Sequence, residues 1–269
     1  MGTYEFDGEK YEQASGHQKV WGQKLLSDLR LDGNESILDL GCGDGVLTEQ
    51  LAHLVPDGSV IGIDASSGMI KTANKRIRNN LQFLYMDMTK MNFMSQFDVI
   101  YSNAALHWVK DHSLLLKRSY AALKPGGKIL WNFAGEGNCS DFFEVIRNII
   151  HTQPYKKYFA TFEWPWYMPS KSEYKELIKF SDFTDAIIIE ENADQSFSNA
   201  DEMIRWIDQP SIVPFLKYIP SEEKAVFRSK VIDACLQKAL QPDGTCFQAF
   251  RRLKISASKQ TVVKHYQGV

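Results

Sequence analysis

Hydrophobic and polar positions follow two alternating periods along the first half of the chain. Short runs rich in β-branched and aromatic residues predict five strands, at 36–40, 60–64, 81–86, 97–103 and 128–133. Between them apolar residues recur at helical spacing, as in 46–54 and in a helix that begins at Ser66 or Ser67 and reaches Ala73. Strands that alternate with helices predict βαβ units and a mostly parallel sheet covered on both faces.

This alternation stops at Phe142. Residues 142–183 hold 12 of the chain's 33 aromatic residues. Beyond them the pattern predicts two helices, at 200–207 and 220–240. It also predicts two further strands, at 184–191 and 246–256. The second half is therefore built differently from the first, around a segment with an unusual density of rings.

Composition narrows the class of protein. The chain has 269 residues, with 31 Lys+Arg against 33 Asp+Glu, 44% hydrophobic and 24% charged residues, which excludes a disordered or fibrous protein. The near-zero net charge of −2 disfavours a nucleic-acid partner. No apolar run is long enough to span a bilayer, and the first residues are polar where a signal peptide would be apolar. Four separated cysteines without a CxxC pair indicate neither zinc nor disulfides, so we expect a cytoplasmic protein with reduced thiols and no metal.

The stretch ILDLGCGDG at 37–45 carries the strongest chemical signal. Its glycines lie where a strand becomes a helix, and glycine there allows a tight turn and a close approach to a ligand. By itself the pattern fits a purely structural turn equally well. Asp64, about 20 residues on, ends the next strand and is placed to accept ribose hydroxyls. Asp87 ends the third strand, placed for an adenine amino group. Neither GxGxxG nor GK[ST] is present, which favours an adenosine ligand without phosphates and with a zwitterionic tail.

These motifs, together with LKPGG at 123–127, resemble the class I S-adenosylmethionine-dependent methyltransferases over roughly residues 10–135. The resemblance implies an α/β fold: a Rossmann-like, seven-stranded, mostly parallel sheet whose last strand is antiparallel, with helices on both faces and an inserted helical cap. It implies S-adenosyl-L-methionine as cofactor and S-adenosyl-L-homocysteine as product. The cofactor-binding positions that it implies are Gly41, Cys42, Gly43, Gly45, Asp64, Ala65, Met69, Asp87, Met88 and Asn103. Asp39 also matches, either as a ligand or only as a support of the loop.

The segment NAALHWVKDH at 103–112 follows the fourth strand, where open parallel sheets bind their ligands. It resembles the same stretch of trans-aconitate methyltransferases, and its LHW part that of juvenile hormone acid methyltransferases. This likeness implies a small-molecule methyl acceptor, most simply O-methylation of a carboxylic acid with an apolar portion. Two alternatives stay open: C- or O-methylation of a quinone-, polyketide- or terpenoid-like metabolite, and a protein that binds the cofactor without turnover.

The same likeness supplies candidate acceptor residues. We expect catalytic roles for His107, Trp108 and Gln18, with His107 as a positioning group or, alternatively, a general base. Substrate contacts are expected from Tyr11, Trp108, Trp166, Arg205 and Trp206. Arg251 and Arg252 are further arginines that could bind an acid, but Arg205 is preferred. His17 and His112 are expected at the surface or as helix caps.

We therefore divide the chain by expected role. The ranges are 1–35 for a helical segment closing over the cofactor, 36–135 for the cofactor-binding core, 136–183 for the aromatic-rich cap, 184–258 for the remaining strands with a second part of the cap, and 259–269 for a flexible tail. The cap is expected to enclose an apolar part of the acceptor and to exclude water. A monomer or a homodimer is expected, with no nucleic acid and no membrane span.

Overall fold

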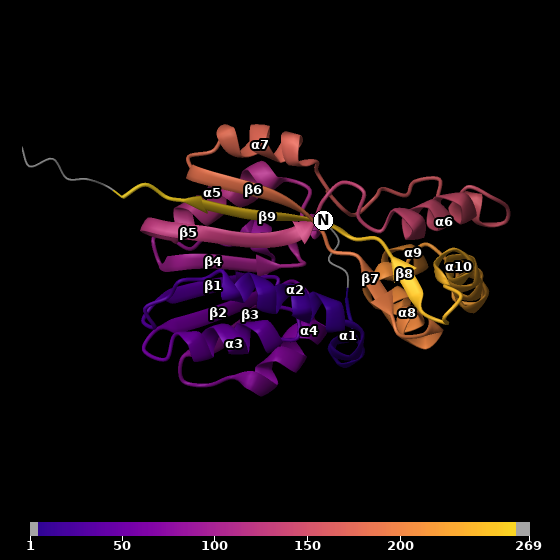
Figure 1. The fold of residues 1–269 in the computed structure, drawn as a ribbon, viewed down its shortest axis with the longest axis horizontal. Helices are drawn as coiled ribbons and strands as arrows, with labels where there is room; N and C mark the ends of the chain where they lie inside the picture. The colour runs from indigo at the N-terminus through magenta and orange to yellow at the C-terminus, as the bar shows by residue number, and fades with distance from the viewer. Residues whose placement is uncertain (1–4, 262–269) are drawn as a thin grey trace, which may run out of the picture.

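The computed structural model describes residues 5–261, which form a twisted sheet with a helical cap beyond one of its ends (Figure 1). The expected tail at 259–269 lies mostly outside the described residues. The sheet has seven strands in the order β3-β2-β1-β4-β5-β9-β6. Their bounds are β1 Ser36–Leu40, β2 Ser59–Asp64, β3 Leu81–Tyr85, β4 Phe97–Asn103, β5 Leu123–Ala134, β6 Thr184–Asn192 and β9 Arg251–Ser258.

Strand directions confirm the predicted fold class. β1 pairs in parallel with β2 and β4, and β3 and β5 continue this direction on either side. The last strand, β9, is antiparallel to both β5 and β6. The carboxyl ends of the parallel strands therefore share one edge, and in Figure 1 this edge faces the cap. Ligands of open parallel sheets bind at that edge.

Two layers of helices cover the sheet. Alternate strand residues such as Ile37 and Tyr101 pack with the helices of one face, and Leu38 and Ile100 with those of the other. The first face carries α2 Gly16–Ser27, α3 Val46–Leu54 and α4 Ser67–Ala73, and the second carries α5 His112–Ala122 and α7 Lys171–Lys179. The expected helix start is correct in detail, because the Ser66 hydroxyl accepts from the backbone N–H of Met69 and caps α4.

The cap has its own apolar cluster, separate from both faces of the sheet. Its elements are α6 Ser140–Ile150, β7 Gln195–Phe197, α8 Ala200–Trp206, α9 Val213–Leu216, α10 Lys224–Ala239 and β8 Cys246–Gln248. Many of the chain's aromatic residues lie in this cluster: Phe159, Phe215 and Phe227 are buried, and their rings contact one another. Part of the ring density therefore builds the cap itself.

Two features of the second half differ from the sequence prediction. The strand expected at 246–256 is broken, because Phe250 leaves the sheet: its N–H donates to Asp194 Oδ1 and its carbonyl accepts from Ala193. β8 consequently pairs with β7 in the cap, and only β9 joins the main sheet. The helix α7 lies within the range 136–183 that we assigned to the cap, but it packs on the sheet, where Tyr174 is fully buried.

The N-terminal helix α1 (Gly8–Ala14) contacts α4 of the core and α8 of the cap. Gly8 is packed so closely that a Cβ there would lie 2.4 Å from the Thr72 hydroxyl oxygen. Just before it, the Phe6 N–H donates to the Ser66 hydroxyl over 3.2 Å. The beginning of the described chain thus bridges core and cap. No helix in the described part of the chain is long and apolar enough to cross a membrane.

Candidate active site

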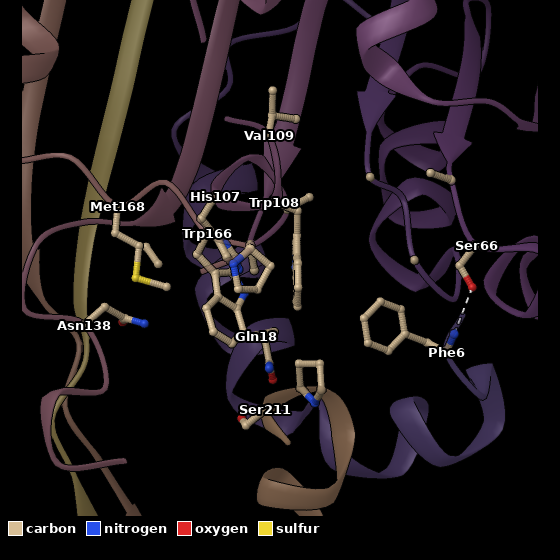
Figure 2. A pocket seen from close by; sticks show the side chains of 18 of the residues that line it. Phe6, Gln18, Ser66, His107, Trp108, Val109, Asn138, Trp166, Met168 and Ser211 are labelled. Atoms are coloured by element: carbon tan, nitrogen blue, oxygen red, sulfur yellow. Dashed lines mark hydrogen bonds between the residues drawn. The ribbon is translucent and has the colours of Figure 1, made fainter. Parts of the chain in front are cut away.

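A cavity of about 410 Å³ lies at the carboxyl ends of the parallel strands, between the sheet and the cap. Figure 2 shows part of its wall. It brings together most of the residues predicted from sequence: Tyr11, Gln18, Gly41, Gly43, Asp64, Ala65, Met69, Asp87, Met88, Asn103, His107, Trp108, Trp166 and Trp206. Three predicted residues, Cys42, Gly45 and Arg205, do not line it.

The glycine loop turns through backbone conformations that side chains rarely adopt. Gly41 has a φ of 74° and Gly43 a φ of 55°. A Cβ on Gly41 would lie only 2.2 Å from the Cβ of Ala105. The N–H groups of Gly41 and Cys42 both donate to the carbonyl of Ile63, over 2.8 and 3.0 Å, which ties the loop to β2. The loop therefore presents bare backbone to the cavity in a fixed geometry.

The two loop residues absent from the wall support it from behind. Gly45 has a φ of 81°, and a Cβ there would lie 2.8 Å from the ring of Phe83. Cys42 is buried, its side chain packed with the apolar cluster on the α3 face of the sheet. Because the chain direction alternates through the turn, these positions face the protein and their neighbours face the cavity. Neither residue lines the main cavity, and their expected part in binding the cofactor stays a prediction.

Asp64 is held at the end of β2 by the backbone. Its carboxylate accepts from the N–H of Ser66 over 2.8 Å and from the N–H of Gly43 over 3.0 Å. Burial raises its pKa to about 6, despite the opposing effect of these hydrogen bonds. Each oxygen keeps a second lone pair, which suits a ligand with neighbouring hydroxyls.

Two other carboxyl groups shape the same region. Asp87 accepts from the N–H and the hydroxyl of Thr89, over 2.8 and 2.7 Å, at the end of β3. Asp39 is 2% exposed and accepts from the hydroxyl of Thr48 over 2.7 Å, and burial raises its pKa to about 7. It is absent from the wall of the main cavity. Asp39 joins β1 to α3, in agreement with the alternative that it supports the loop.

Three buried polar atoms in the described chain converge on the cavity without a protein partner: Gln18 Oε1, Asn103 Oδ1 and His107 Nδ1. Asn103 Nδ2 meanwhile donates to the Gln18 carbonyl over 2.9 Å, which fixes α2 against β4. Buried polar groups are normally hydrogen-bonded, so partners from a ligand are expected here. These atoms, the glycine backbone, the Asp64 carboxylate and the apolar side chains of Met69 and Met88 fit an adenosine ligand with a charged tail.

The backbone of His107 is clamped from two sides. It lies in the turn η3 (Leu106–Trp108), where the His107 carbonyl accepts from the Tyr167 N–H over 2.8 Å. His112 Nε2 lies 2.9 Å from the Leu106 carbonyl, and His112 Nδ1 lies 3.1 Å from the Tyr174 hydroxyl. His112 is thus 1% exposed and His17 is also buried, so the expected surface positions of both are wrong.

The His107 ring stays neutral. Burial lowers its pKa well below the ordinary value, and the charge of Arg252 lowers it further. A neutral imidazole offers one donor and one acceptor nitrogen. A ring with so low a pKa is a weak proton acceptor, which favours the positioning role over that of a general base.

Aromatic rings continue the wall from this turn into the cap. Figure 2 shows the Trp108 ring between those of Trp166 and Phe6. The ring centroid of Trp108 lies 5.2 Å from that of Trp166 and 5.7 Å from that of Phe6. Trp166 in turn lies 5.1 Å from Phe143. One part of the cavity is therefore polar and lies over the glycine loop, while the other is lined by rings.

The structure replaces the predicted arginine with another. Arg205 is exposed, because Met203 and Trp206 take the buried side of α8 and Arg205 faces away. Arg252, at the start of β9, lines the cavity and is 3% exposed. Its Nε and Nη2 donate to the side chain and the carbonyl of Asn132, over 2.8 and 3.1 Å. Its guanidinium also lies 4.5 Å from the ring centre of Trp21.

Sequence reasoning also missed parts of the wall. Phe6, Asn138, Phe143 and Trp164 line the cavity but were not chosen. The density of rings at 142–183 was a usable signal for the last two. Nothing in the sequence distinguishes them from Phe159 and its neighbours, which are core of the cap.

Residues 37–127 match the family model described as a methyltransferase domain. Residues 37–127 are a methyltransferase domain. The chain is also similar to an uncharacterized methyltransferase of Schizosaccharomyces pombe, 28% identical over 94% of this chain and 99% of the relative. It is 29% identical to a trans-aconitate 2-methyltransferase of Mycobacterium tuberculosis, over 92% of this chain and 94% of the relative.

A solved structure shares the fold of this chain. Phosphoethanolamine N-methyltransferase 2 of Haemonchus contortus, in complex with S-adenosyl-L-methionine, superposes with a TM-score of 0.60 at 21% identity, covering 94% of this chain and 57% of that one. The family match and the relatives agree with the predicted methyltransferase, and the solved structure agrees with the predicted fold.

Proposed function

We propose that this methyltransferase transfers the methyl group to a carboxyl oxygen of a small-molecule acid and so forms a methyl ester. The observation that carries the proposal is Arg252, a buried cation in the cavity wall. Among the described residues no carboxylate oxygen lies within 4.0 Å of it, and its Nη1 has no hydrogen-bond partner. An uncompensated buried charge is costly, on the order of several kcal/mol, and an anionic acceptor offsets this cost.

The surroundings of Arg252 support this assignment. Burial lowers its pKa to about 10, so it remains charged at neutral pH. Glu191 acts on its pKa from farther away, but that carboxylate is already paired with Lys24 at 3.3 Å. A carboxylate acceptor would therefore find a cation with a free N–H group and no competing anion in contact. The names of the trans-aconitate relatives point to the same acceptor chemistry.

The donor side needs only binding and orientation. S-adenosyl-L-methionine supplies an activated methyl group on a positively charged sulfur. Gly41 and Gly43 present backbone to its tail, Asp64 accepts its ribose hydroxyls, and Asp87 faces its adenine. The unpartnered oxygens of Gln18 and Asn103 accept from its ammonium group.

The acceptor side needs no proton transfer, because a carboxylate is already ionised at neutral pH. His107, neutral and clamped through its backbone, orients the acceptor by a hydrogen bond. Trp108 and Trp166 close the cavity against water, and Tyr11 with Phe6 closes it from the N-terminal side. The main contribution of the protein is to hold the acceptor oxygen in contact with the methyl carbon and in line with the bond from that carbon to the sulfur.

The other acceptor class is methylation at carbon or oxygen of an apolar quinone-, polyketide- or terpenoid-like metabolite. The ring-lined part of the cavity suits such a molecule, but a neutral acceptor leaves Arg252 uncompensated. Deprotonating a carbon or a hydroxyl would also call on a base, and His107 is a weak one.

The test is methyl transfer into a metabolite extract. The protein is incubated with S-adenosyl-L-methionine labelled in its methyl group, and labelled products are resolved by mass spectrometry before and after mild base. We expect a labelled small molecule whose label is released by base, as an ester requires. Label that survives the base treatment would overturn the proposal and point to transfer to carbon or nitrogen.

A further inference from the structure

Positive charge is unevenly distributed in the part of the cavity away from the glycine loop, where the acceptor would bind. Three basic residues line the cavity in the described part of the chain, Lys110, Lys217 and Arg252. Both lysines are exposed and lie at the rim, so Arg252 is the one buried cation among them. A ligand carboxylate that leaves water inside the cavity has a single buried cationic partner.

Beyond Arg252 the wall is formed by rings and other apolar groups. Phe143 lies 5.6 Å from Trp164 and 5.1 Å from Trp166, measured between ring centroids, and these rings continue from Trp108. The neighbouring wall residues are Phe142, Pro165, Met168, Pro210 and Tyr218. We call Phe143, Trp164 and Trp166 the aromatic wall.

Two polar side chains near the aromatic wall already have hydrogen-bond partners. Asn138 accepts from the Arg251 N–H and donates to the Cys139 sulfur, both over 3.1 Å. The Ser211 hydroxyl donates to the Trp206 carbonyl over 3.3 Å. Glu163, also at this end, is exposed and carries the same charge as a carboxylate. A second carboxylate placed here would lose water and gain no buried cation. The guanidinium of Arg147 lies 4.8 Å from the ring centre of Trp164, but Arg147 is exposed and absent from the cavity wall.

From this distribution we infer that the methyltransferase selects acids with one carboxylate and an aromatic or aliphatic body, and rejects polycarboxylates. The carboxylate takes Arg252 and the body packs on the aromatic wall. This inference rests on the proposed function, since it assumes an acid acceptor. It separates the chain from the relatives named for trans-aconitate, a tricarboxylate, although the sequences align over most of their length.

The experiment is a comparison of kcat/KM for four probes with the full chain and S-adenosyl-L-methionine: cinnamic acid, octanoic acid, trans-aconitic acid and cinnamyl alcohol. We expect at least one monocarboxylate to exceed trans-aconitic acid by about 100-fold or more, since each uncompensated buried charge costs several kcal/mol. Equal or better turnover of trans-aconitic acid overturns the inference but leaves the proposed function intact. Turnover of the alcohol alone, or of none of the acids, overturns both.

A charge placed in the aromatic wall sharpens the result. Phe143→Lys adds a second cation beside Trp166, and we expect it to lower the preference for cinnamic over trans-aconitic acid by about 10-fold or more. Phe180→Lys is the matched control, because Phe180 is 84% exposed and absent from the cavity wall. Melting temperatures confirm that both variants fold. An unchanged preference in a folded Phe143→Lys protein contradicts the inference.

Discussion

The two halves of the cavity are built on different principles. The half over the glycine loop is made of backbone: Gly41, Gly43 and the N–H groups that hold Asp64. The half under the cap is made of side chains from segments far apart in the chain, including Trp108, Trp166 and Arg252. The first depends on conformations that few residues adopt, whereas the second depends on which side chains happen to converge.

This difference predicts that the two halves of the cavity respond differently to substitution. A binding loop fixed by positive φ angles tolerates little change, so it binds one donor molecule. A wall of side chains is altered by single substitutions without disturbing the sheet. Donor binding and acceptor choice should therefore respond to different mutations.

The largest effect is expected in the backbone-built half. In Gly41→Ala the new Cβ would lie 2.2 Å from Ala105 Cβ, so the loop or the Ala104–Ala105 segment must move. We expect affinity for S-adenosylhomocysteine, measured by calorimetry, to fall by about 1,000-fold because the turn that faces the cofactor is displaced.

The control for this variant is Gly244→Ala. Gly244 has a similar φ of 86°, but nothing lies within 4 Å of a Cβ there. It therefore carries the same backbone strain without the collision. Equal affinity in both glycine variants would show that the loop geometry does not govern cofactor binding.

A large but selective effect is expected in the other half. Arg252→Met removes the buried cation, and we expect kcat/KM for an acid acceptor to fall about 100-fold while S-adenosylhomocysteine affinity stays within about 3-fold. Arg205→Met is the matched control on the exposed side of α8 and should leave both quantities unchanged. Parallel loss of donor and acceptor binding in Arg252→Met would contradict the separation.

A moderate effect is expected from the titration of Asp64. Its pKa is raised to about 6, and the cofactor hydroxyls need the ionised form as acceptor. Affinity for S-adenosylhomocysteine should therefore be flat between about pH 6.5 and 7.5, and should fall by up to about tenfold per unit below pH 6. Calorimetry across this range measures it. Asp64→Asn should bind more weakly at pH 7 and lose this pH dependence; an identical slope in the variant would assign the titration to another group.

The smallest effect is expected at His107. Because its pKa lies well below the ordinary value, it is already neutral above pH 6 and does not change charge there. His107→Asn should lower kcat about tenfold through loss of orientation, while the pH profile of kcat/KM above pH 6 keeps its shape. If the kcat/KM of the native enzyme fell on one side of a pKa near neutrality and the variant lacked this fall, His107 would instead be the general base.

Local sequence signals predicted the backbone-built half well. Apolar runs and glycines located β1, β4 and α3 at their observed bounds, because each depends on neighbouring residues. Asp64 was placed correctly since a residue that ends a parallel strand has little freedom in where it lies.

The acceptor half was less predictable because it depends on tertiary packing. Arg205 and Arg252 look alike in sequence, and only the packing of Met203 and Trp206 turns one outward while Asn132 holds the other inside. His112 resembles a helix cap in the sequence, but in the fold it is buried against Tyr174, which is 62 residues away along the chain. Phe250 broke a continuous strand pattern because its hydrogen bonds go to the 193–194 turn.

The position of the transferred methyl group tests the account most directly. The best monocarboxylate acceptor is prepared with ¹⁸O in its carboxyl group and incubated with the protein and S-adenosyl-L-methionine carrying a deuterated methyl group. Saponification breaks the acyl–oxygen bond of a methyl ester, so the account predicts deuterated methanol that carries ¹⁸O, detected by mass spectrometry. Deuterium retained on the acid after saponification would contradict it.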